Sequence, residues 1–133
     1  MAERVIIVHT LEHAVSALEA AAELNQSVIL QSAPDAIFYA GSLYLLQMFE
    51  QAKTYHPGVS ARFILDCGDA GAETVGAMSI GHKHIRIRDS GFRIQDIAQQ
   101  YGVNVHAEPY EALDLRQPRD TKAACKQWLE KNA

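Results

Sequence analysis

Short apolar runs alternate with helical patterns along this chain, and this alternation is the feature that most restricts its fold. Five segments have the pattern of strands, at residues 4–8, 27–31, 62–65, 83–88 and 103–108. The first is a continuous β-branched run typical of a strand covered on both faces, whereas the last two alternate between apolar and polar residues. Helical patterns follow these segments after short connections, which favours parallel strands joined by right-handed crossovers. We therefore predict an α/β fold, with residues 1–133 as one domain and helices flanking a five-stranded, mainly parallel sheet.

The first of these units shows the pattern most clearly. Leu11, Val15 and Leu18 recur at helical spacing directly after the run at residues 4–8. Thr10 is a suitable N-cap for this helix, and Asn25 accepts the left-handed conformation that ends one. Beyond residue 108 the pattern predicts one further element, an amphipathic helix near the end of the chain.

Two arrangements of such a sheet satisfy the pattern: an open doubly wound sheet, or part of a (β/α)8 barrel. Five strands cannot close an eight-stranded barrel, so barrel order would leave one face of the sheet open. Residues 5–8 and 28–30 are apolar throughout, and the open face would expose some of them to water. We therefore expect a homo-oligomer, most simply a two-fold dimer.

The composition argues against several classes of function. A formal net charge of −4 over 133 residues opposes general affinity for nucleic acids, which needs a basic surface. No apolar run is long enough to span a bilayer, and residues 1–8 lack the features of a signal peptide. Cys67 and Cys125 form no CxxC pair, so we expect reduced thiols in a cytoplasmic protein without nucleic-acid or membrane partners.

The third predicted strand ends in a group of reactive side chains. Asp66, Cys67 and Asp69 follow it, and the chain then turns through small residues into a helix. Sites in α/β proteins lie at such strand ends. One interpretation makes Asp66 a general acid/base beside a nucleophilic or metal-binding Cys67 thiolate. The other makes the carboxylates helix caps and Cys67 an inert, half-buried thiol.

Polar residues also stand at the carboxyl ends of the other predicted strands. His9, Cys67, His106 and Glu108 could converge on a divalent metal, but their spacing matches no recognised site. We therefore predict no bound metal and no other cofactor.

The second strand ends in Gln31 and Ser32, which could orient a hydroxyl group of a ligand or satisfy backbone groups of the loop. In that loop, residues 37–39 form an Ile-Phe-Tyr trio. It could be a lid over a pocket, or part of ordinary packing or an interface.

The fourth strand has one basic face. His84, Arg86 and Arg88 alternate with isoleucines, and Asp89 and Ser90 follow. These side chains could hold a phosphate or carboxylate by charge-assisted hydrogen bonds. They could also be the solvated face of an edge strand, where charge prevents unwanted pairing.

Four segments in order resemble the first part of class II fructose-bisphosphate aldolases. They are LEHA with AAEL at residues 11–14 and 21–24, VILQS with AIFYAG at 28–32 and 36–41, ILDCG at 64–68, and GVNVHAE at 102–108. The resemblance covers about residues 10 to 108 and implies the first five βα units of a barrel.

The resemblance also assigns roles to individual residues. It implies that Asp66 is the catalytic acid/base, that Cys67 replaces a zinc-binding histidine and that Ile64 replaces an earlier one. His106 stands for the first of two paired glutamates, and Glu108 is the second. The chain stops before the remaining barrel strands, which in that family carry further zinc ligands and the loops that hold sugar phosphate.

The expected function is therefore binding of a small anionic metabolite by a degenerate aldolase-like domain, without aldolase turnover. One alternative is a lyase or aldol-type enzyme that uses Asp66, and another is an assembly protein whose sheet edge and open face are interfaces. The predicted catalytic residues are Asp66 and Cys67, and the predicted ligand-binding residues are His9, Gln31, Ser32, Arg86, Arg88, Asp89, Ser90, His106 and Glu108.

Overall fold

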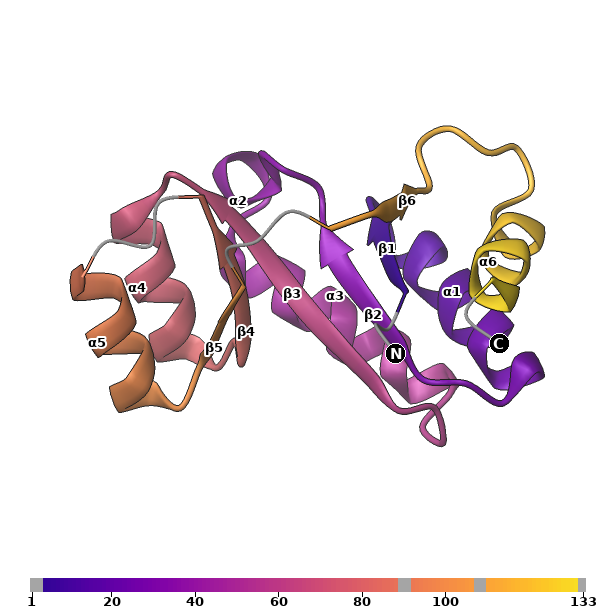
Figure 1. Cartoon of the computed structure of the whole chain (residues 1–133), viewed down its shortest axis with the longest axis horizontal. Coiled ribbons are helices and arrows are strands. Elements are labelled where there is room, and N and C mark those ends of the chain that lie inside the picture. Colours follow the sequence, from indigo (N-terminus) through magenta and orange to yellow (C-terminus); the bar gives the residue numbers. More distant parts are fainter. Residues whose placement is uncertain (1–3, 89–91, 107–109, 132–133) are drawn as a thin grey trace.

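A computed structural model describes residues 4–88, 92–106 and 110–131, with the side chain of Phe92 left out (Figure 1). The strands are β1 (Val5–Val8), β2 (Val28–Ser32), β3 (Ala61–Gly68), β4 (His84–Ile87), β5 (Asn104–His106) and β6 (Ala112–Asp114). The helices are α1 (Leu11–Leu24), α2 (Ala36–Tyr39), α3 (Ser42–Tyr55), α4 (Gly71–Ile80), α5 (Phe92–Tyr101) and α6 (Thr121–Glu130). The predicted α/β fold with a parallel sheet is confirmed.

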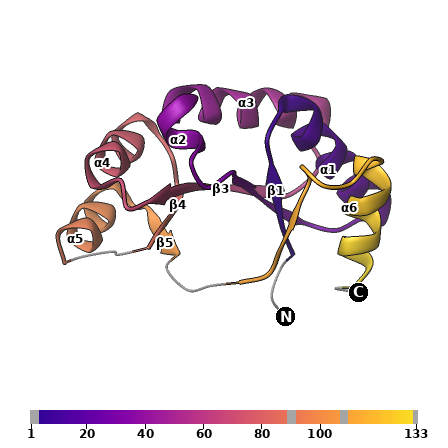
Figure 2. The same ribbon diagram turned by 90° about the horizontal axis from the view of Figure 1, so that it is seen from above.

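The strand order decides between the two predicted arrangements. The sheet runs β5-β4-β3-β2-β1-β6, so the first five strands lie side by side in chain order. Figure 2 shows the helices along the outer, convex side of the curved sheet. A doubly wound sheet reverses its strand order at one point and carries helices on both faces. The barrel-like order is therefore correct, and the doubly wound alternative is wrong.

The predicted number of strands is also wrong, because β6 forms a sixth. It pairs in parallel with β1, with Val5 opposite Ala112 and Ile7 opposite Asp114. The backbone N–H of Leu115 then donates to the carbonyl of Ile7 over 3.1 Å. Three residues are too few to show an alternating pattern, so pairing with the edge of β1 defines this strand.

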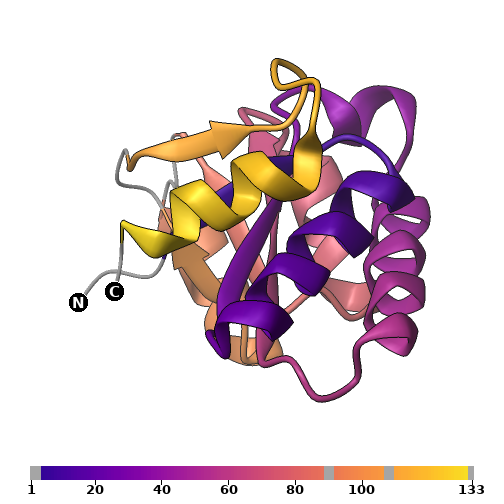
Figure 3. The same cartoon turned by 90° about the vertical axis from the view of Figure 1, so that its right-hand side faces the viewer.

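Two predicted helix caps are present in α1. The Thr10 hydroxyl accepts a hydrogen bond from the His13 backbone N–H at 3.1 Å, and Asn25 adopts the left-handed conformation with φ of 54°. Helix α6 begins at the capping carboxylate of Asp120 and packs along α1, as Figure 3 shows. There the Lys122 ammonium lies 2.7 Å from a carboxylate oxygen of Glu19.

Strand β3 is longer than the sequence pattern predicts, and its alternation separates the two faces of the sheet. Phe63 stacks on Phe49 of α3, with ring centroids 5.1 Å apart, so odd-numbered residues of β3 face the helices. Leu65 and Cys67 lie on that side and are fully buried. Asp66 therefore points to the opposite, concave face of the sheet. On the neighbouring strands β2, β4 and β5, the residues next to the helix-facing core residues point to the same concave face.

The loop after β2 contains the single-turn helix α2, which the sequence pattern does not predict. In the Ile-Phe-Tyr trio, Ile37 is buried, whereas Phe38 and Tyr39 are exposed.

The concave face exposes less apolar surface than expected among the described residues. Val5 and Ile64 are only 5% and 2% exposed, whereas Ile7 and Ile29 are of intermediate exposure. The exposed large apolar side chains instead belong to α2 to α5: Phe38, Tyr39, Leu43, Tyr44, Tyr55, Ile80 and Tyr101. In the described part of the chain, no helix combines the length and the apolar character needed to cross a bilayer.

The position of β6 leads to a prediction about stability. Leu115 follows β6 and is 1% exposed, so Leu115→Ala should lower the free energy of unfolding by about 2–5 kcal/mol. Leu43→Ala is the matched control. Because the side chain of Leu43 is 53% exposed, its loss should change stability by at most about 0.5 kcal/mol. Urea denaturation measures both, and equal effects would contradict the packing of this segment into the core.

Candidate functional site

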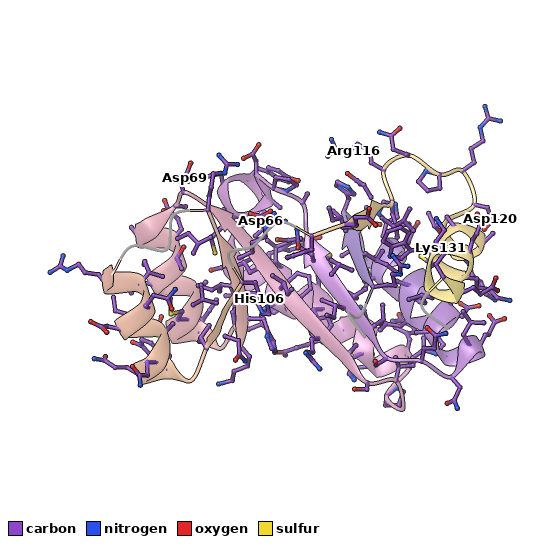
Figure 4. The ribbon with its side chains drawn as sticks, in the orientation of Figure 1. Asp66, Asp69, His106, Arg116, Asp120 and Lys131 are labelled. Carbon is purple, nitrogen blue, oxygen red and sulfur yellow. The ribbon has the colours of Figure 1, made fainter. Side chains whose placement is uncertain are left out.

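Side chains of four adjacent strands lie together on the concave face of the sheet. We call them the concave row: Gln31 of β2, Asp66 of β3, His84 and Arg86 of β4, and His106 of β5. The ladder places Asp66 opposite Arg86, and Arg86 opposite His106. Figure 4 labels Asp66 and His106 on this part of the sheet. Gln31, Asp66, Arg86 and His106 are predicted site residues, and the strand order makes them neighbours.

The Asp66 carboxylate is held by hydrogen bonds within the row. One of its oxygens accepts the Gly68 backbone N–H at 3.0 Å, and the other lies 3.5 Å from the Gln31 side-chain nitrogen. The Asp66 backbone N–H donates to the hydroxyl of Ser32 at 2.8 Å. Asp66 is 8% exposed, so its carboxylate has a defined position at the edge of the row.

Tyr110 completes this face, and sequence analysis missed it. Its hydroxyl donates to the carbonyl oxygen of the Gln31 side chain. The Arg86 guanidinium lies over its ring, 4.5 Å from the centroid. Burial raises the pKa of Tyr110, the positive charge of Arg86 opposes that rise, and the charge of Asp66 adds to it. No local pattern marks this tyrosine, because its partners come from β2 and β4.

Two histidines form the basic end of the row. His84 Nδ1 and His106 Nε2 are 3.2 Å apart. Burial is the main cause that lowers the pKa of each ring, and the positive charge of Arg62 lowers both further. The neutral rings can share one hydrogen bond, in which one nitrogen donates and the other accepts. Protonation would add positive charge beside Arg86.

Cys67 and Ser32 point away from the concave row. Cys67 is fully buried on the helix side of β3, and burial raises the pKa of its thiol to about 11. A protonated thiol is a poor nucleophile and a poor metal ligand. Ser32 is fully buried, and its hydroxyl accepts the hydrogen bond from the Asp66 backbone N–H.

The residues present do not fit the zinc site that the resemblance implies. Cys67 and Asp66 lie on opposite faces of β3, and the position of the earlier histidine is occupied by Ile64. Within the described ranges, no three His, Cys, Asp or Glu side chains are grouped in a way that could hold a metal ion.

The remaining predicted residues are dispersed. Arg88 is exposed and pairs with Asp69 at 3.5 Å, beyond the end of β4. Asp89, Ser90 and Glu108 lie outside the described residues.

His9 belongs to a separate cluster at the carboxyl ends of β1 and β6. His9 Nε2 lies 2.6 Å from the Asp114 carboxylate, and Arg116 Nη2 lies 3.2 Å from His9 Nδ1. The His9 backbone N–H donates to His13 Nδ1 at 3.1 Å.

Burial would raise the pKa of Asp114, but hydrogen bonds from the Arg116 backbone and from His9 outweigh it, so this pKa is lowered. Sequence analysis missed Asp114 and Arg116 because it missed β6, which carries Asp114 and leads directly to Arg116.

Comparison with known proteins supports the fold and gives no information on the residues of the site. No protein-family model matches the chain, and no curated protein matches it. Solved structures do match it. One is the crystal structure of a "putative fructose-1,6-biphosphate aldolase" from Coccidioides immitis, with a TM-score of 0.66 and 21% identity over 90% of this chain.

The match covers 46% of that protein, so this chain spans less than half of its length. At 21% identity the likeness shows a shared architecture, and on that basis the predicted aldolase-like fold is confirmed.

Proposed function

We propose that this chain binds a small phosphorylated or carboxylate metabolite at the concave row and does not turn it over as an aldolase. The observation that supports this proposal is the convergence of Arg86, His84 and His106 on one face of the sheet. Arg86 and His106 lie near the carboxyl ends of β4 and β5, the ends at which α/β folds bind ligands, and His84 begins β4. The chain as a whole has a net charge of −4, so the positive charge that Arg86 offers to an anion is local.

Arg86 is the principal anion-binding group in this proposal. A guanidinium presents its N–H groups in a planar fork that matches two oxygens of a carboxylate or phosphate. Tyr110 covers one face of this plane and so restricts its orientation. The amide of Gln31 is occupied by Tyr110 and Asp66, so Gln31 has a positioning role.

A lyase that uses Asp66 is the alternative. The Asp66 carboxylate lies on the same face as Arg86, close to where an anion would bind. Cleavage of a sugar bisphosphate by the wild type, lost in Asp66→Asn, would favour this alternative over binding alone.

We further propose a homodimer formed through the sheet edges. In the described part of the chain, β5 pairs only with β4, and β6 pairs only with β1. Strands paired on one side present backbone groups that a second chain can satisfy.

Anion binding should stabilise the protein through Arg86. Sulfate at ten times its Kd should add about 1.4 kcal/mol to the free energy of unfolding of the wild type, with the corresponding rise in Tm. Arg86→Ala should remove this increment, because the fork that binds the anion is lost. Arg93→Ala removes the same charge from an exposed position of α5 and should keep the full increment. Equal stabilisation of all three proteins would mean a general salt effect and would contradict the site.

The stabilisation by sulfate should depend on pH through His84 and His106. Without sulfate, the pKa values of both rings are lowered in the folded protein, so their contribution to the free energy of unfolding is fully present above the unfolded pKa of about 6.5. It is lost as the pH falls through the lower folded values. A bound anion favours the protonated rings, so stabilisation by sulfate should grow as the pH is lowered from about 7.5 to about 5.5.

The double variant His84→Gln/His106→Gln should show much less of this growth. The matched control is His56→Gln, because His56 lies at the end of α3 and outside the row. This variant should keep the growth seen in the wild type. Growth of the same size in the double variant would show that other groups cause the pH dependence.

The dimer is tested by light scattering at micromolar concentration. The expected species has twice the 14.7 kDa mass of one chain. A species of 14.7 kDa would contradict the dimer and leave the metabolite proposal untouched.

A further inference from the structure

A cavity opens at the carboxyl end of β1, away from the concave row. It has a volume of about 420 Å³, within the range of small-molecule sites. Val8, Ala36 and Leu45 provide a buried apolar lining, and His9 borders it. The rings of Tyr39 and Tyr44 also line the cavity, although they are 70% and 57% exposed.

These two tyrosines distinguish the cavity from ordinary surface. Both line the same hollow and keep much of their surface in contact with water. A flat aromatic ligand would cover their apolar surface and could stack offset or edge-on against them. Alanines at positions 33, 36 and 40 leave room for such a ring, since each ends in a single methyl group.

Arg116 contacts His9, one of the residues that line this cavity. A guanidinium only donates hydrogen bonds, so the contact with Arg116 makes His9 Nδ1 an acceptor. In that tautomer His9 Nε2 carries the proton and donates a hydrogen bond to the Asp114 carboxylate over 2.6 Å. The His9 ring is thus held between Asp114 and Arg116, and it places the exposed Arg116 next to a residue that lines the cavity. Figure 4 labels Arg116 just beyond β6.

We propose that this cavity binds a small aromatic carboxylate. Its ring lies against Tyr39 and Tyr44 over the apolar lining, and its carboxylate pairs with Arg116. One oxygen of Asp114 accepts hydrogen bonds from His9 and from the Arg116 backbone, which fixes the carboxylate on the far side of the His9 ring from the Arg116 guanidinium. This site is independent of the concave row.

Calorimetric titration with three probes of one shape tests the charge preference. The probes are 2-naphthoate, the neutral 2-naphthamide and the cationic 2-naphthylmethylamine. The wild type should bind 2-naphthoate about tenfold or more tightly than either of the others, because only the carboxylate pairs with the guanidinium. Equal affinity for the three, tighter binding of the amine, or no binding of 2-naphthoate would overturn the proposal.

Matched variants locate the binding. Arg116→Ala should reduce the affinity for 2-naphthoate to that for the amide, whereas Arg119→Ala, an exposed arginine of the same loop, should leave it unchanged. Tyr39→Ala should weaken binding of both 2-naphthoate and 2-naphthamide, whereas Tyr55→Ala, 58% exposed on α3 and outside the cavity lining, should not.

Each of these side chains is exposed, so the variants should fold. Unchanged affinity in Arg116→Ala or in Tyr39→Ala would refute the assignment. Arg86→Ala should bind 2-naphthoate like the wild type, so failure here and failure at the concave row are distinguishable.

Discussion

The two-residue alternation of the parallel strands is the constraint on which the concave row depends. Leu65 and Cys67 occupy the helix side of β3 and are fully buried, so Asp66 between them must face the concave side. A shift of one residue would place this carboxylate among apolar side chains and expose the core residues. The same rule in β4 buries Ile85 and presents Arg86 beside Asp66. The helices pack on Leu65, Cys67 and Ile85, and this packing places Asp66 and Arg86 on the other face of the sheet.

One segment completes both candidate sites. Residues 110–116 contribute Tyr110 to the concave row, and Asp114 with Arg116 to the cluster around His9. The same segment forms β6 and buries Leu115 in the core. Loss of its pairing with β1 would therefore disturb both candidate sites together, although the ligands that we propose for them are chemically distinct. In our proposals, the concave row offers Arg86 and two imidazole rings to a compact anion, and the cavity beside β1 offers aromatic rings with Arg116 nearby.

Cysteine chemistry has no part in either site. Burial raises the pKa of the Cys67 thiol to about 11 and that of the Cys125 thiol to about 12. Both side chains are fully buried, in β3 and in α6 respectively. They pack as small apolar groups, which is the usual role of a buried thiol without a nearby cation.

The amino-acid sequence by itself determined the features that depend on neighbouring residues. Alternation of strands and helices, the caps Thr10 and Asn25, and the placement of Gln31, Asp66 and Arg86 at strand ends all follow from local spacing. Only the tertiary structure decided the strand order, the existence of β6, and the contacts of Tyr110 and Arg116. These features depend on partners far apart in the chain, whose approach is governed by sheet curvature and helix packing. A three-residue strand or a single loop tyrosine carries no local pattern, because its energy of interaction comes almost entirely from those distant partners.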